Sequence, residues 1–535
     1  MNDGEHTVNA SRHRRELLGW LTYAFASEVF VIVSLTLFLP ICLEQFARDN
    51  GYLLPEKTVP CSSAREKVDE DVRCVVKLGW AWIDTASFSL YVYSMSVALQ
   101  ALTVISMGGI ADHPPHRKPL LSFFAFLGSF SALLFLLLPS SSTLWPFSGL
   151  LAIFANIGFG ASIVVLNSYL PSLARSALAS SPTSLALEDD GPTYTAQLSR
   201  TTSRISSLGI ALGYAAGIAL LALTLVPVTR LGGSTFALRL AIGGSGAWWA
   251  LFSVPAIILL PSVRAQEAAV LEQEQAGLLA GEDAPPLREK DWNTRREIIA
   301  AWRRLGTMLR WREIKRLRNT FRYLAAWFLL SDGFTTLTST ALLFAKTTLH
   351  LPASALILVG VLSPSAGILG ALLWPVLQRR YQMSNLRVLV LLVGLASLIP
   401  AYGCIGLFFG AAGGWGLRTA GEMYVLAVFF GSVYGAFQSY ARALYAEIIP
   451  PGEEARWYGL FSITDKSSSF LGPLIVGVIA DTTGNIRYAF FFLVLMLWAA
   501  LPVLWGVDVE RGRADAQALA VGDARREDEG RVALE

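Results

Sequence analysis

The sequence predicts an all-α membrane protein with twelve transmembrane helices in two pseudo-symmetric six-helix halves. Three observations support this fold class. Of the 535 residues, 53% are hydrophobic and only 16% are charged, whereas about a quarter of the residues of a soluble domain carry a charge. Apolar runs long enough to cross a hydrocarbon core of roughly 30 Å recur along the chain. Short patterns from the first half also recur, in the same order, in the second half, as a duplicated bundle would show.

The apolar runs divide the chain into tails, halves and a central loop. The parts are an N-terminal tail (1–16), a first half (17–263), a central loop (264–319), a second half (320–508) and a C-terminal tail (509–535). The twelve spans are predicted at residues 17–42, 85–108, 119–138, 144–170, 204–228, 240–263, 320–346, 354–377, 386–408, 421–446, 457–480 and 488–508. An even number of spans leaves both tails on one side. Most of the 43 Lys and Arg residues lie on that side, so the positive-inside rule predicts that it is cytosolic.

Three pairs of short matches indicate the internal repeat. The pairs are residues 23–30 (YAFASEVF) with 327–334 (WFLLSDGF), 160–169 (GASIVVLNSY) with 431–440 (GSVYGAFQSY), and 204–209 (RISSLG) with 466–472 (KSSSFLG). They match the first span with the seventh, the fourth with the tenth and the fifth with the eleventh. The first pair aligns Glu28 with Asp332. An acid near the centre of a span costs about 2.5 to 3.5 kcal/mol on insertion scales, so both acids need a reason to be there.

Asp332 shares a helical face with Thr335, Thr336 and Ser339, and we expect this polar stripe to line a cavity rather than to face lipid. Glu28 has fewer polar neighbours. Burial penalises the charged form of a carboxyl group, so either acid is a candidate to accept a proton. Binding of a substrate ammonium group, and pairing with a basic neighbour for packing alone, remain open for both acids.

Further candidates for the transport pathway lie in the fourth and tenth spans. Arg442 follows Gln438 at helical spacing, and a guanidinium group there is suited to hold a carboxylate. An ion pair with Glu447 or snorkelling to the membrane edge are the structural alternatives. Asn156 and Asn167 offer amides to the same cavity, or satisfy hydrogen bonds between helices.

The loop after the second span carries a candidate gating motif. Residues 108–118 read GGIADHPPHRK, which resembles the G-x-x-x-D and basic-pair signature of the major facilitator superfamily. The resemblance implies that Asp112, Arg117 and Lys118 form a charge network that steadies the cytosolic face. The two prolines depart from the usual pattern, and the equivalent segment of the second half, QRR at 378–380, is degraded.

The adjacent charges Asp465 and Lys466 in the eleventh span are also candidates for gating, through local charge compensation. Cys61 and Cys74 share a polar loop after the first span. On a noncytosolic side they form either a disulfide or two free thiols.

The central loop contains two features of a different kind. Residues 295–318 are strongly basic with apolar residues near helical spacing, which predicts a helix against the inner leaflet, or alternatively a regulatory partner site. Glu274 followed by Leu278 and Leu279 matches the acidic dileucine pattern that sorting adaptors bind, although so short a pattern also arises by chance.

Several chemical classes find no support in the sequence. It contains no Walker loop, no H-E-x-x-H motif and no clustered metal ligands, and the five histidines fall in tails or loops. We therefore expect neither an enzyme nor a bound cofactor. The formal net charge of +3 does not indicate nucleic-acid binding.

Four stretches taken together resemble one family of the superfamily, the fungal vacuolar amino-acid effluxers named autophagy-related protein twenty-two. They are residues 19–30 (GWLTYAFASEVF), 167–171 (NSYLP), 331–335 (SDGFT) and 447–472 (EIIPPGEEARWYGLFSITDKSSSFLG). The resemblance implies a vacuolar membrane protein that releases amino acids, notably leucine and other bulky neutral ones, from the lumen to the cytosol after autophagic degradation. Alternating access around a midplane cavity is the expected mechanism. Proton symport and facilitated efflux both stay open, as does a non-transporting sensor or lipid-handling protein on the same fold.

Overall fold

The computed structural model is almost entirely helical. It describes residues 2–54, 57–61, 74–79, 81–179, 192–231, 234–261, 294–349, 351, 353–408, 416–469, 471–483 and 485–532. Within these ranges, eleven helical segments are long and apolar enough to cross a membrane. The predicted fold class is confirmed, whereas the count of twelve spans stays a prediction.

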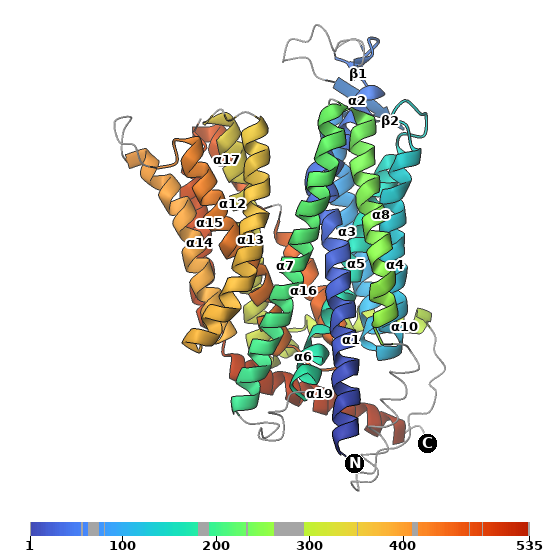
Figure 1. Cartoon of the computed structure of the whole chain (residues 1–535), viewed down its shortest axis with the longest axis vertical. Helices are drawn as coiled ribbons and strands as arrows, with labels where there is room; N and C mark the ends of the chain where they lie inside the picture. The colour runs from blue at the N-terminus through green and yellow to red at the C-terminus, as the bar shows by residue number, and fades with distance from the viewer. Residues whose placement is uncertain are drawn as a thin grey trace.

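Helices of the first half occupy the right of Figure 1. They are α1 (Asn2–Val29), the π-helical η1 (Phe30–Phe38), α2 (Leu39–Asp49), α3 (Thr85–Asp112), α4 (Pro114–Leu134), the 3₁₀ turn η3 (Phe135–Leu137), α5 (Phe147–Ser168), α6 (Leu170–Ala179), α7 (Pro192–Arg230) and α8 (Thr235–Leu259). The first predicted span is thus one continuous helical segment made of α1, η1 and α2.

Most helices of the second half form the group at the left of Figure 1. Its helices are α12 (Arg318–Thr347), α13 (Ala353–Tyr381), α14 (Asn385–Phe408), α15 (Ala420–Glu447), α16 (Glu454–Ser468), α17 (Leu471–Thr483), α18 (Tyr488–Trp505) and the tail helix α19 (Val509–Val532). The two halves meet where α7 packs against α13 and where α16 packs against α3.

The eleventh predicted span is divided into α16 and α17. Ser468 and Ser469 donate their hydroxyl groups to the Asp465 carbonyl at 2.9 and 2.8 Å. Such side-chain bonds compete with the helical ladder and favour a helix end. Pro473, in the first turn of α17, has no N–H to donate and is tolerated there. Neither part reaches the length that a single span needs.

Both tails lie at one end of the bundle, which we call the terminal face: α1 begins there, and α19 lies across it (Figure 1). The opposite end carries a three-stranded antiparallel sheet of β1 (Tyr52–Leu53), β2 (Cys74–Leu78) and β3 (Ala81–Asp84). Of the two alternatives for the loop cysteines, the structure has the disulfide: Cys61 and Cys74 are bonded, with their Cα atoms 6.2 Å apart.

The helix predicted in the basic segment is present as α10 (Thr294–Met308) and α11 (Trp311–Arg316). The helix α10 packs against α3, and the Trp302 indole donates to Ser106 Oγ at 3.0 Å. Contact of these helices with a membrane stays a prediction. The dileucine pattern of Glu274, Leu278 and Leu279 lies outside the described residues.

Candidate functional site

The first contact between the halves is centred on Asp112, at the end of α3. Its Oδ1 accepts hydrogen bonds from the backbone N–H groups of Ala455 at 2.7 Å and Arg456 at 3.3 Å. These groups belong to the first turn of α16, where N–H groups have no partner within their own helix. The N-cap residue of α16, Glu453, makes no side-chain cap bond. Asp112 therefore caps α16 from the other half, where a carboxylate also matches the helix dipole.

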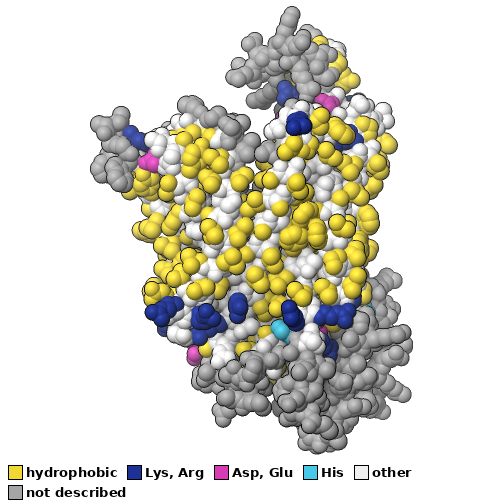
Figure 2. Space-filling model, viewed as in Figure 1, with side chains coloured by type: hydrophobic (Ala, Val, Ile, Leu, Met, Phe, Trp, Pro, Cys, Tyr) yellow, Lys and Arg dark blue, Asp and Glu magenta, His cyan; other side chains and the backbone are white. Residues whose placement is uncertain are grey.

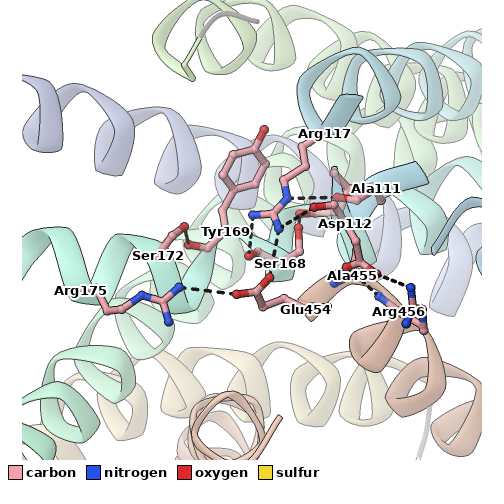
Figure 3. Close-up of polar contacts among 11 residues, drawn as sticks. Ala111, Asp112, Arg117, Ser168, Tyr169, Ser172, Arg175, Glu454, Ala455 and Arg456 are labelled. Carbon is pink, nitrogen blue, oxygen red and sulfur yellow. Dashed lines mark hydrogen bonds and ion pairs between the residues drawn. The ribbon is translucent and has the colours of Figure 1, made fainter. Parts of the chain in front are cut away.

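Arg117, at the start of α4, completes this contact. Its Nη2 donates to Glu454 Oε2 at 3.0 Å and its Nε to the Ala111 carbonyl at 3.0 Å. Arg175 of α6 approaches the other carboxylate oxygen of Glu454 at 3.5 Å. Figure 3 shows the two arginines reaching Glu454 from different helices of the first half. Both Arg117 and Glu454 are buried, so the charges are compensated away from water.

The gating prediction named two of these residues and missed their partners. Asp112 and Arg117 lie in the same contact, where Arg117 Nη2 donates to the Asp112 backbone carbonyl at 3.3 Å. Lys118 instead donates to the Leu260 carbonyl at 3.0 Å and is not part of the contact. A gating role for these residues stays a prediction. Glu454 and Arg456 were not predicted. Arg456 pairs with Asp112 at 3.6 Å and also with Glu453. Glu454 and Arg456 lie hundreds of positions along the chain from Asp112 and Arg117. The periodicity of a single helix therefore does not predict that these residues meet.

A second contact between the halves lies at the same face, around Glu447 at the end of α15. Glu447 Oε1 accepts from Ser199 Oγ of α7 at 2.7 Å and from Asn385 Nδ2 of α14 at 2.6 Å. Its Oε2 accepts from Arg513 of α19 at 2.9 Å. The tail helix thus supplies the cation of this contact. From the sequence, Glu447 was predicted only as an alternative partner for Arg442.

Gln378 extends the second contact with neutral groups. Its Oε1 accepts from Ser203 Oγ at 3.1 Å and from the Tyr440 hydroxyl at 3.0 Å, while its Nε2 donates to Asn385 Oδ1 at 2.7 Å. Gln378 begins the degraded QRR segment. Neutral hydrogen bonds of the Gln378 and Asn385 amides therefore join the halves beside the charged pair of Glu447 and Arg513.

Above these contacts, polar side chains of both halves form what we call the central cluster. Its members are Glu28 of α1, Asn167 of α5, Tyr434, Gln438 and Arg442 of α15, and Asp465 and Lys466 of α16.

Arg442 connects the central cluster to the first half. It donates to Asn167 Oδ1 and to the Ser206 carbonyl, each at 3.3 Å. Its Nε is buried and has no hydrogen-bond partner. Arg442 and Glu28 attract each other electrostatically. The guanidinium therefore retains donor capacity for a further acceptor.

Glu28 lies where α1 and α7 approach closely. A Cβ atom added to Gly213 would lie 2.8 Å from Glu28 Cβ, so a larger residue on α7 would displace the acid. Lys466 is the second cation that attracts Glu28. Lys466 Nζ lies 3.4 Å from Asp465 Oδ2, and Asp465 also accepts a hydrogen bond from Ser331. The local compensation between Asp465 and Lys466 is present, but both residues belong to the central cluster.

Asp332 has a different environment from that of Glu28. Its Oδ1 accepts from the Gly472 N–H, at the start of α17, at 3.0 Å and from Thr336 Oγ1 at 3.2 Å. Its Oδ2 is buried without a hydrogen-bond partner. The polar residues predicted to share a face with Asp332 differ in exposure. Thr336 is buried beside the acid, whereas Thr335 and Ser339 are exposed. The pseudo-equivalence of the two acids in sequence therefore does not place them together.

The other two amide side chains predicted for the pathway, those of Asn156 and Gln438, form hydrogen bonds to neighbouring side chains. Asn156 donates to Ser96 Oγ at 2.8 Å and links α5 to α3 inside the first half. Gln438 donates to the Tyr434 hydroxyl at 2.7 Å. Among the residues that the structure describes, no group of three or more His, Cys, Asp or Glu side chains is arranged to hold a metal ion.

Comparisons with known proteins identify close relatives. The sequence model of a family described as "Vacuole effluxer Atg22 like" matches residues 12–517. Autophagy-related protein 22 of Cryptococcus neoformans is 41% identical over 570 residues, covering 93% of this chain and 95% of the relative. Autophagy-related protein 22 of Gibberella zeae is 37% identical over 552 residues, covering 95% and 81%.

Solved structures show the fold. The proton:xylose symporter XylE of the major facilitator superfamily has a TM-score of 0.59 at 12% identity, covering 93% of this chain and 95% of the symporter. A bacterial homologue of the iron transporter ferroportin, in an outward-facing state, has a TM-score of 0.55 at 14% identity, covering 92% and 98%. At such low identity these likenesses establish the major-facilitator fold and nothing about cargo.

Proposed function

Because the chain belongs to the vacuole effluxer Atg22-like family and has the fold of a membrane transporter rather than an enzyme, we propose that it exports amino acids from the vacuole lumen to the cytosol. Leucine and other bulky neutral amino acids are the proposed cargo. The observation that supports this is the central cluster, in which an acid of one half, Glu28, and a guanidinium group of the other, Arg442, lie close enough to interact electrostatically.

A zwitterion matches this pair of charges. Its carboxylate would bind the Arg442 guanidinium, whose Nε lacks a partner, because guanidinium and carboxylate groups form directed, charge-assisted hydrogen bonds. Its ammonium group would bind the Glu28 carboxylate. Since the two groups belong to different halves, a bound amino acid would couple the halves, as alternating access around a midplane site requires.

The direction of transport follows from the proposed orientation. The basic residues favour a cytosolic terminal face, and a disulfide at the opposite end fits an oxidising, noncytosolic compartment. The contacts around Asp112 and Glu447 would then hold the cytosolic side closed. Release of the amino acid requires these contacts to break, so their strength sets how readily the carrier opens to the cytosol.

Transport by the purified full-length protein in vesicles tests the proposal. We expect labelled leucine to move down its gradient, and an imposed pH gradient then distinguishes symport from facilitated efflux. Glu28→Gln and Arg442→Gln should each reduce the rate at least tenfold. Glu44→Gln and Arg230→Gln, at the opposite end of the bundle, are matched controls that should transport normally.

Modified competitors make the site assignment sharper. N-acetyl-leucine lacks the ammonium group and leucine amide lacks the carboxylate, so neither should compete with leucine for the wild type. Failure of the wild type to move leucine under either condition would refute the transport proposal. Normal transport by both Glu28→Gln and Arg442→Gln would instead refute the central cluster as its site.

A further inference from the structure

Five arginines surround the second contact at the terminal face, and we call them the arginine rim. They are Arg200 and Arg204 of α7, Arg379 and Arg380 in the last turn of α13, and Arg387 in the first turn of α14. Figure 2 shows Lys and Arg side chains in a band along the lower edge of the hydrophobic surface, on the side of the terminal face. Because the rim arginines lie at or near the helix ends on that side, we expect them at the depth where lipid headgroups meet the protein.

Among the residues that the structure describes, no acidic side chain pairs with an arginine of the rim. The described residues of α7, α13 and α14 include no Asp or Glu. Within the described ranges, no hydrogen bond or ion pair is made by the side chains of Arg204, Arg379, Arg380 and Arg387. The nearby Glu447 carboxylate is already bonded to Arg513, Ser199 and Asn385. Around Asp112, by contrast, the arginines face carboxylates.

The turn after α13 holds the arginines of the two halves close together. Met383 donates its N–H to the Gln378 carbonyl at 3.1 Å, and Gln382 has a φ of 52°. This is the helix end in which glycine is usual, because a side chain is strained at positive φ. The Gln382 side chain instead accepts a hydrogen bond from Arg200. The turn is thereby bonded to α7, which brings Arg200 beside the end of α13.

An apolar stripe leads along α13 to the rim. Its residues are Leu369, Leu372, Leu373 and Val376, all of them exposed at spacings of three and four. The stripe ends one turn before Arg379 and Arg380. An acyl chain against the stripe and an anionic headgroup on the arginines match a single phospholipid in both parts.

We propose that the arginine rim binds the headgroup of a polyanionic phospholipid in the leaflet at the terminal face. Several unpaired guanidinium groups suit a headgroup that carries a phosphate monoester beside its phosphodiester, because each arginine can donate to two phosphate oxygens. Since α7 belongs to one half and α13 and α14 to the other, the headgroup bridges the halves. It therefore favours the state in which the terminal face is closed.

Lipid retention by the full-length protein tests this site independently of its cargo. Native mass spectrometry of the purified protein with phosphatidylinositol monophosphate, phosphatidylserine or phosphatidylcholine should show one tightly held lipid only with the first. Arg379→Gln/Arg380→Gln/Arg387→Gln should lower that retention at least tenfold. Arg14→Gln/Arg318→Gln/Arg511→Gln removes the same charge from exposed positions at the same face, and it should retain the lipid as the wild type does.

Two results would overturn the assignment. One is retention of phosphatidylserine or phosphatidylcholine by the wild type as strong as that of the phosphorylated lipid. The other is an equal loss of retention in the two triple variants, because generic surface charge would then explain binding. If the rim triple variant does not fold, Arg204→Gln/Arg387→Gln removes one arginine from each half, and it must still lower retention for the proposal to stand.

Discussion

Asp112→Ala should loosen the start of α16, because the cap that Asp112 provides comes from the other half of the protein. The variant removes hydrogen bonds to the N–H groups of Ala455 and Arg456. Loss of an N-cap acceptor costs about 0.5–2 kcal/mol, and a buried amide left without a partner costs about 1–3 kcal/mol. The two figures describe the same bonds and do not add. We therefore expect the free energy that keeps the first turn of α16 formed to fall by about 2 kcal/mol. This corresponds to a roughly 30-fold larger population in which that turn is open.

Hydrogen exchange of the full-length protein measures this effect directly. Amides in the first turn of α16 should exchange roughly 30-fold faster in Asp112→Ala. Asp112→Asn keeps an acceptor oxygen and loses only the charge, so about 1 kcal/mol, or roughly fivefold, is expected. Asp49→Ala, at the opposite end of the first half, is the control. Exchange in Asp112→Ala within about threefold of the wild type would refute the capping role, as would equal effects of Ala and Asn.

Two further predictions concern stability. Gly472→Ala should lower the melting temperature, because the new Cβ would lie 2.8 Å from Asp332 Oδ1 and also meet Thr336; overpacking of this kind costs about 1–3 kcal/mol. Gly477→Ala, which meets nothing within 4 Å, is its control, and equal melting of the two variants would contradict the contact. Cys61→Ser should destabilise the sheet region by about 3 kcal/mol, seen as faster proteolysis there, and should leave one thiol at Cys74 open to labelling. A wild-type protein that labels at both positions without reductant would contradict the disulfide.

The candidate site was predictable only in part. The acidic position in an apolar run identified Glu28, and a short signature identified Asp112 and Arg117. Neither pattern identified Glu454, because its partner Arg117 is 337 positions away and a local motif contains no information on what it will touch. Arg442 was found as an isolated cation in a span, yet its bonds to Asn167 and Ser206 required the packing of α15 against the first half.

By itself the sequence predicted the all-α membrane fold and the placement of both tails at one end of the bundle, because hydrophobicity and helical period are local properties of the chain. Only the tertiary structure decided the surroundings of the two acids that the repeat aligns. The repeat aligned Glu28 with Asp332, but Glu28 lies in the central cluster, while Asp332 is buried against Gly472 at the break of the eleventh span. Equivalent positions in two halves acquire different neighbours, because α17 begins beside Asp332, whereas the unbroken α7 runs past Glu28.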